Sequence, residues 1–284
     1  MNWNKIDEYD NALIDVENNV QDKSSLAWKK LCEYVDIVAE EERDEFSPFE
    51  YLGRELFSQI YTLPESIAKL KNVKKIWLYG SQLKRIPPEI GKMESLEYFD
   101  PYTSYNLHWF PYEITKCKNL KDSRVSTRAL YGNYKYRKPF PELTNNPVRY
   151  DGKILTCSVC EKEMDYTETN QLWISLGVGT DVLPLLVNLC SKECENKLPK
   201  PSSNYLQYPH KGGKSLKQPM NDFERWEIER AKWLKKTESE KESTNEKEST
   251  NDVESLFNIN IYNDAKINFK DLPVLKLIKK IWEK

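Results

Sequence analysis

The sequence predicts an α/β fold in which a short solenoid of repeats follows a helical N-terminal cap and precedes a small α+β module and a partly flexible tail. Three observations lead to this organisation. An apolar-Pro pair recurs at nearly constant spacing, four of the six cysteines form two close pairs, and a polar six-residue string is duplicated near the C-terminus. With 284 residues, 39% of them apolar, the chain is long enough for a sizeable core and more than one module.

The repeat is marked by Leu63-Pro64, which returns as Ile86-Pro87 and as Phe110-Pro111, in steps of 23 and 24 residues. Further apolar positions follow the same steps: Ile67, Ile90 and Ile114; Leu70, Met93 and Cys117; Val73, Leu96 and Leu120. One repeat cannot bury such positions alone, so neighbouring repeats are expected to stack and to form a ladder of parallel strands.

Between Val73 and Leu83 the sequence reads Val-x-x-Ile-x-Leu-x-x-Ser-x-Leu. This pattern resembles the bacterial leucine-rich repeat, in its 23-residue form with a Leu-Pro-x-x-Ile turn. The resemblance covers about residues 50–130 and implies leucine-rich repeats over 49–135. It weakens where Pro101 takes the place of inward-facing Leu78 and where Ser123 takes the place of Ile76, so the third repeat is expected to merge into a cap.

Residues 1–48 are predicted to form the helical N-terminal cap. Apolar side chains spaced three or four apart define one face of a helix there, with Ser24 or Ser25 as its N-cap. These side chains are Trp28, Leu31, Cys32, Val35 and Val38. A terminal unit that shields the repeat core is needed for solubility. An independent helix that merely precedes the repeats is the alternative.

The residues that alternate with the buried strand positions are expected to project from the concave face of the repeats. They are Lys75, Trp77 and Tyr79; Tyr98, Asp100 and Tyr102; and Asp122, Arg124 and Ser126. Exposed Trp, Tyr and Arg are the residue types most enriched in binding hot spots, so we predict a partner-binding face. In the alternative, the ladder satisfies itself, with Asp100 paired to Arg124 and Tyr79 stacked on Tyr102.

The cysteine pairs Cys157/Cys160 and Cys190/Cys194 lie in a predicted metal-binding module over residues 136–216. Four thiolates match the tetrahedral preference of zinc, and a closed four-Cys site is structural. The second pair resembles the last ligands of treble-clef zinc modules, which sit at the start of a helix, and Ser191 could cap that helix. Four independent buried thiols or a redox pair are the alternatives.

The tail is divided into two parts. Residues 217–251 are predicted as a helix, with Phe223, Trp226 and Trp233 on one side, followed by a linker in which "EKESTN" occurs at 240–245 and again at 246–251. Residues 252–284 are predicted as a strand and an amphipathic helix with Leu275, Ile278 and Trp282 on one face. Docking in cis, recruitment of a partner and contact with a membrane surface are the roles considered for that helix.

We predict a cytoplasmic bacterial protein with no signal peptide and no transmembrane segment. The 43 basic and 45 acidic residues give a net charge of -2, which supplies no general attraction for nucleic acid. His is nearly absent and His108 is interpreted as a structural or surface residue, so we predict no catalytic residue and no enzyme activity. The function predicted is recognition of a protein partner, with immunity or a defence system as the setting. The alternative is a zinc-dependent, nucleic-acid-associated regulator that uses the lysines between Lys197 and Lys217.

Overall fold

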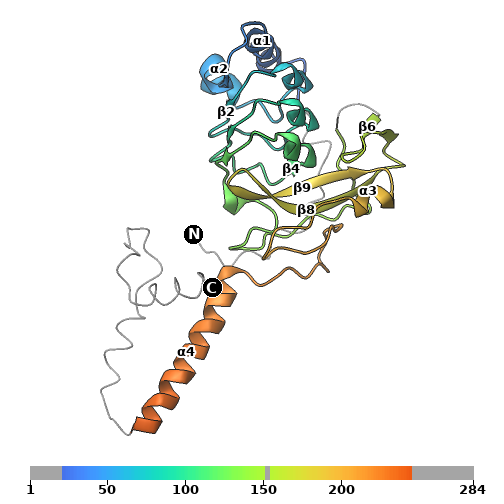
Figure 1. Ribbon diagram of the computed structural model, residues 1–284. Coiled ribbons are helices and arrows are strands. Elements are labelled where there is room, and N and C mark those ends of the chain that lie inside the picture. Colours follow the sequence, from blue (N-terminus) through green and yellow to red (C-terminus); the bar gives the residue numbers. More distant parts are fainter. Residues whose placement is uncertain (1–20, 151–153, 245–284) are drawn as a thin grey trace. The chain divides into compact units, whose positions relative to one another are not determined.

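The computed structural model describes residues 21–150 and 154–244 and combines α-helices with small β-sheets (Figure 1). The chain divides into two compact units, residues 1–228 and 229–284. The last described helix extends from the first unit into the second, and all other described elements belong to the first unit. Residues 1–20 of the predicted cap and the whole predicted strand and amphipathic helix at 252–284 lie outside the described residues.

The N-terminal region begins with helix α1 (Leu26–Glu40). Ser25 is its N-cap, because the Ser25 hydroxyl accepts a hydrogen bond from the Trp28 N–H at 3.2 Å. The predicted apolar face is buried except for half-buried Cys32. A short strand, β1 (Glu45–Phe46), and helix α2 (Pro48–Phe57) follow. Strand β1 was not predicted, and it joins this region to the repeat sheet.

The first sheet contains four short parallel strands in the order β1-β2-β3-β5. The last three are β2 (Lys75–Trp77), β3 (Tyr98–Asp100) and β5 (Asp122–Ser123). The register aligns Lys75 with Tyr98 and Tyr98 with Asp122, so the strands are offset by the 23 and 24 residues of the sequence repeat. Strand β3 ends directly before Pro101, which has no N–H to give to a ladder.

A short 3-10 helix follows each repeated apolar-Pro pair, and one more follows strand β5. They are η3 (Glu65–Lys69), η4 (Pro88–Lys92), η5 (Tyr112–Lys116) and a fourth after β5, η6 (Thr127–Ala129). The prolines of the pairs, Pro64, Pro87 and Pro111, are the N-caps of the first three. All predicted repeat core positions are buried except Leu120, which is half-buried. Figure 1 shows these turns following one another from α2 to β4.

A second sheet takes one strand from the repeat region and two from the cysteine region, in the order β4-β9-β8. Strands β8 (Asn170–Val178) and β9 (Asp181–Leu189) form a long antiparallel hairpin, and β4 (Phe110–Pro111) pairs with β9 in parallel. A separate two-stranded sheet consists of β6 (Ile154–Thr156) and β7 (Glu163–Asp165). One hydrophobic core runs from α1 through the repeats to Cys194.

Pro184 lies inside the central strand β9 without breaking it. Its partner across the hairpin is Ser175, whose carbonyl points to the other side and accepts the Ser202 N–H at 2.9 Å. The β4 pairing begins one residue later, at Leu185. Neither neighbouring strand therefore needs an N–H from residue 184, which explains why proline is tolerated there.

The tip of the β8–β9 hairpin binds the last strand of the parallel sheet. Ser123 Oγ donates to the Val178 carbonyl at 3.1 Å, and Thr180 Oγ1 donates to the Ser123 carbonyl at 2.7 Å. Gly179 at the tip has φ +59°, and a Cβ there would lie 2.9 Å from Ser123 Oγ. The hairpin therefore covers the edge of β5, which would otherwise offer unpaired backbone groups to another chain.

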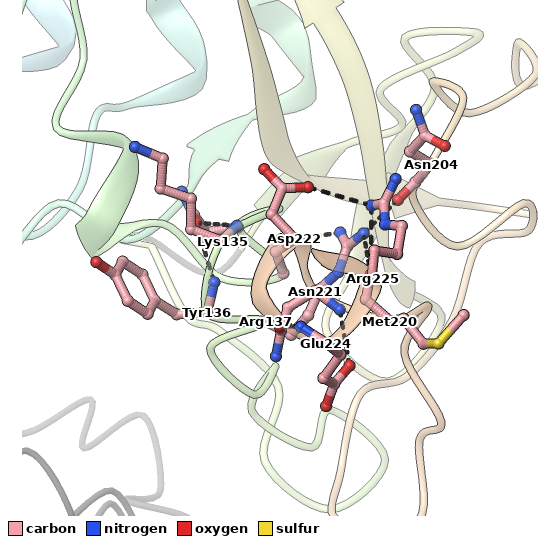
Figure 2. A network of polar contacts seen from close by, with 11 residues as sticks. Lys135, Tyr136, Arg137, Asn204, Met220, Asn221, Asp222, Glu224 and Arg225 are labelled. Carbon is pink, nitrogen blue, oxygen red and sulfur yellow. Dashed lines mark hydrogen bonds and ion pairs between the residues drawn. The ribbon is translucent and has the colours of Figure 1, made fainter. Parts of the chain in front are cut away.

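Helix α4 (Asp222–Thr244) begins with a reciprocal cap: Asn221 Oδ1 accepts the Glu224 N–H, and Glu224 Oε2 accepts the Asn221 N–H, both at 2.8 Å. The helix continues into the first "EKESTN" copy, where a linker was predicted, because Glu and Lys are good helix formers. Figure 2 shows the buried Arg137 guanidinium pointing toward the start of α4, where it donates to the Met220 carbonyl at 3.2 Å.

Candidate functional site: a four-cysteine cluster and an aromatic face

The two predicted cysteine pairs come together in space. Cys157 and Cys160 lie in the turn between β6 and β7, Cys190 follows β9, and Cys194 lies in helix α3 (Lys192–Asn196). Their four Sγ atoms all lie within 4.8 Å of one another, and no disulfide joins any of the six cysteines. The four cysteines could therefore hold a metal ion.

The sulfur separations agree with tetrahedral coordination. A Zn–S bond of about 2.3 Å implies sulfur atoms about 3.8 Å apart. The Cys160–Cys190 and Cys190–Cys194 sulfurs are 3.5 and 3.6 Å apart. The donor set and its spacing thus fit a closed four-thiolate site.

Local backbone hydrogen bonds hold Cys157 and Cys194 in place. In the first pair, the Cys157 N–H donates to the Lys162 carbonyl at 2.8 Å and the Glu161 N–H donates to the Cys157 carbonyl at 2.9 Å. In the second, Ser191 caps α3 by accepting the Cys194 N–H at 3.2 Å, as predicted. The turn is also fixed to β9, since the Ser158 N–H donates to the Asn188 carbonyl at 2.7 Å.

The site favours a thiolate at Cys157. Burial of the sulfur raises its pKa, but hydrogen bonds from the backbone N–H groups of Cys160, Val159 and Cys190 outweigh burial and lower the pKa to about 7. Thiolates are the form of cysteine that binds metal. The backbone hydrogen bonds thus favour the thiolate of Cys157, the form that could bind a metal ion.

An aromatic cluster lies on the parallel sheet, at positions predicted to face a partner. Trp77 packs against Tyr98 with ring centroids 5.0 Å apart, and Tyr79 lies against Tyr102 at 6.1 Å. Tyr79 is 58% exposed and Tyr102 is 40% exposed. The guanidinium of Arg124 lies over the Tyr102 ring at 5.1 Å. The sheet therefore presents large, mutually supported aromatic side chains to solvent.

Asp100 and Ser126 differ from the prediction that they project outward, because both are buried. The chain turns at Pro101, and the Asp100 carboxylate folds back to accept the Tyr102 N–H at 2.9 Å. Arg124 lies 3.8 Å from the same carboxylate, which is the ion pair considered as an alternative. Ser126 Oγ accepts a backbone N–H from Thr103 at 2.7 Å. The two buried side chains thus fix the backbone at Tyr102 and Thr103.

Lys75 and Asp122, at opposite ends of the parallel sheet, both contact other residues of the chain. Lys75 lies 2.7 Å from Glu45 of β1, whose other oxygen accepts the Trp77 indole N–H at 3.0 Å. Hydrogen bonds from Lys75 and Trp77 lower the pKa of Glu45. Sequence reasoning missed Glu45 because its strand lies outside the repeats. At the opposite end, the Asp122 carboxylate lies 3.1 Å from Thr180 Oγ1.

His108 lies in a largely buried polar pair. Its Nδ1 is 2.7 Å from the Ala129 carbonyl, and its Nε2 is 3.4 Å from the Lys138 ammonium. Burial and the Lys138 charge lower the pKa of His108 to about 4, so the ring is neutral at pH 7.

No protein-family model matches this chain, and a search of the curated proteins finds no relative. Within residues 21–150 and 154–244, no helix combines the length and apolarity needed to cross a bilayer.

Proposed function

We propose that this chain is a non-catalytic recognition protein of the leucine-rich repeat type that binds a protein partner. The binding surface, here called the aromatic face, comprises Lys75, Trp77, Tyr79, Tyr98, Tyr102, Asp122 and Arg124. The observation that carries the proposal is the exposure of Tyr79 and Tyr102, just beyond the ends of β2 and β3, beside Arg124, whose side chain is 61% exposed. Such residues dominate binding hot spots.

Contacts between successive turns support the repeat assignment. Gly80 and Thr103, one period apart, both adopt left-handed backbone geometry, with φ +68° and +61°. Ser81 and Ser104, also one period apart, share a buried hydrogen bond at 2.7 Å. Equivalent residues thus occupy equivalent positions in neighbouring turns, which is the behaviour of stacked repeats. We propose a short solenoid that begins at the N-terminal cap and is covered at its far edge by the β8–β9 hairpin.

The metal we propose for the four-cysteine cluster is structural zinc. Four sulfur ligands leave no open coordination position, so the ion would link the β6–β7 turn, the end of β9 and helix α3. Thiol ligands without disulfides suit a reducing compartment, which supports a cytoplasmic location.

The lysines of the nucleic-acid alternative are partly engaged within the chain. Lys197 lies 2.8 Å from Glu193, and Lys211 donates to Asn170. Together with a net charge of -2, these contacts favour a protein partner over a phosphate backbone. A protein toxin or a component of a defence system is the partner class we propose.

The test compares two double variants under identical conditions. Tyr79→Ala/Tyr102→Ala removes the exposed rings of the aromatic face. Tyr136→Ala/Tyr208→Ala removes two rings of similar exposure, 50% and 54%, elsewhere on the molecule. Each tagged variant is expressed in the source cell, and bound proteins and nucleic acids are identified together.

We expect a stoichiometric protein partner that the wild type and the Tyr136→Ala/Tyr208→Ala control retain and the face variant loses. Circular dichroism of both variants establishes that they are folded. A partner retained equally by the face variant would contradict the proposed surface. Salt-sensitive nucleic acid in place of a protein would favour the regulator alternative.

A further inference from the structure

A cavity of about 430 Å³ lies between the last turn of the repeats, strand β8 and the segment after α3. This volume is within the range of small-molecule sites. Three stretches of chain line it: the η5 region up to Leu120, the end of β8 with the hairpin turn, and the segment from Pro199 to Ser202. The cavity is distinct from both the aromatic face and the cysteine cluster, because it shares no residue with either.

Aliphatic side chains form the apolar part of the lining. They come from both sides of the cavity and belong to the continuous hydrophobic core or pack against it. They are Ile114, Leu120, Leu176 and Val178. Ile114 is fully buried and Leu176 and Val178 are nearly so, so a short hydrocarbon chain would lie chiefly against half-buried Leu120. The contact would remove apolar surface from water, which is favourable at about 25 cal/mol per Å².

The edge of β8 brings backbone hydrogen-bonding groups to the same cavity. Trp173 exchanges outward backbone hydrogen bonds with His210, and the outward Ser175 carbonyl accepts the Ser202 N–H. Backbone groups on one edge of an antiparallel strand recur at every second residue. Gly177 is next in this series and lines the cavity, so its N–H lies along that edge.

The charged lining residues are two lysines. Lys118 and Lys200 are both exposed at the cavity, and no acidic side chain is among its lining residues. Lys118 Nζ donates to the Thr115 carbonyl at 2.8 Å, and no ion pair of the described residues includes either lysine. Two ammonium groups beside a strand-edge N–H form a positively polarised rim over an aliphatic floor. An anionic group with an apolar tail complements both parts.

We propose that this cavity binds a small amphipathic carboxylate, a monocarboxylic acid with a short aliphatic chain. The carboxylate accepts hydrogen bonds from the Gly177 N–H and from the lysine ammonium groups, and the chain lies on the aliphatic floor. This site is independent of the partner-binding function proposed above, so either proposal can fail without the other.

The experiment is isothermal titration calorimetry of the full chain with three probes. Octanoate carries both features, octylammonium keeps the chain but reverses the charge, and acetate keeps the charge but has no chain. We expect saturable one-to-one binding of octanoate, and binding at least tenfold weaker for the other two. Raising the salt concentration should weaken octanoate binding, because the rim charges are exposed to solvent.

Two variants locate the site. In Gly177→Pro, the strand-edge N–H is removed, and no hydrogen bond between β8 and β9 is lost because the backbone groups of residue 177 point to the open edge. Octanoate binding should weaken at least tenfold, as expected when a hydrogen bond to a charged group is lost, and the unfolding temperature should be kept. In Lys118→Gln/Lys200→Gln, the Kd should rise about threefold to tenfold, as expected when two exposed ion pairs are removed. The matched control, Lys29→Gln/Lys217→Gln, removes two exposed lysines elsewhere and should leave the Kd unchanged.

Three results would each overturn the proposal: no saturable octanoate binding to the wild type, octylammonium binding as tight as octanoate, or undiminished octanoate binding in folded Gly177→Pro. If Gly177→Pro fails to fold, the Kd values of the lysine variant and its control are compared, and equal values would reject the site.

Discussion

The parallel sheet and the β8–β9 hairpin bury apolar surface in different ways. Each turn of the parallel sheet contributes a strand of two or three residues and the same few core positions, so its stability is spread over similar layers. The hairpin has two nine-residue strands that are buried on both faces over most of their length. One feature holds each end of the hairpin: the four-cysteine cluster lies at one end and the turn at Gly179 lies at the other. Single substitutions in the parallel sheet should therefore change the stability little, whereas substitutions at a few positions of the hairpin should lower it strongly.

The largest effect is expected from Cys160→Ser. Loss of one ligand opens a site whose metal would supply on the order of 10 kcal/mol of folding free energy. Bound zinc should disappear, and proteolysis and hydrogen exchange should increase over residues 154–198 far more than over residues 63–125. The matched control is Cys32→Ser, a free cysteine outside the cluster, which should keep both zinc and protection. If Cys160→Ser keeps its protease resistance, the cluster is not a structural metal site.

A smaller effect is expected from Gly179→Ala at the other end of the hairpin. A non-glycine residue pays about 1–2 kcal/mol for left-handed geometry, and the new Cβ would also meet Ser123 Oγ. Urea unfolding should show a loss of about 2 kcal/mol. Gly177→Ala, two residues away, has open space at its Cβ and no left-handed geometry, so it should change stability by less than about 0.5 kcal/mol. Equal losses in the two variants would mean that the tip does not hold β5.

Acid should weaken the molecule through its two histidines, and His210 contacts the hairpin directly at Trp173. Burial lowers the pKa of His108 and His210 to about 4, while the unfolded chain titrates near 6.5. Between these values the unfolded chain binds more protons, so the free energy of unfolding falls as the pH falls from 6.5 to 4. At pH 5 each histidine should cost about 2 kcal/mol.

The double variant His108→Asn/His210→Asn tests this pH dependence, because the asparagine amide lies where Nδ1 lies in histidine and can reproduce the hydrogen bonds to Ala129 and Gly212. Thermal unfolding at pH 7.5 and pH 5 should show a clearly smaller acid-induced decrease in the variant than in the wild type. An identical decrease in both proteins would assign the acid sensitivity to carboxylates or thiols.

The smallest effect on stability is expected from Trp77→Ala in the parallel sheet. Trp77 is only half-buried, and its contacts are with Tyr98 and Glu45. Chemical unfolding should reveal a loss of about 1 kcal/mol, while capture of the partner should be strongly weakened. A loss above about 3 kcal/mol would show that Trp77 is a core residue.

Periodicity explains which elements could be predicted from the sequence. The offsets of 23 and 24 residues appear directly in the strand register, and the spacing of Val35 and Val38 identified the buried face of α1. The two close cysteine pairs likewise predicted the cluster, because metal ligands occur in such pairs. In each case, a local pattern reflects a local geometric requirement.

The remaining features depend on contacts between residues far apart in the sequence. Strands β8 and β9 are buried on both faces over most of their length, so that polar Gln171, Ser175 and Asn188 lie inside the fold, which period-2 alternation does not predict. The pairing of β4 with β9 joins residues more than seventy positions apart. Asp100 followed the alternation of a strand, yet its carboxylate is buried, because it accepts hydrogen bonds from the Tyr98 hydroxyl and the Tyr102 N–H. The strand pairing has no short-range signal, and Pro101 signals the turn but not the burial of Asp100.

The hairpin tip also has a consequence for synthesis on the ribosome. Ser123 and Thr180 are separated by 57 residues, so β5 emerges long before the residues that cover it. At about 5–20 residues per second, the edge of the parallel sheet stays open for roughly 3–11 seconds in every nascent chain. During that interval neighbouring nascent chains on the same messenger could pair edge to edge. Chains truncated before residue 180 would keep this edge open permanently.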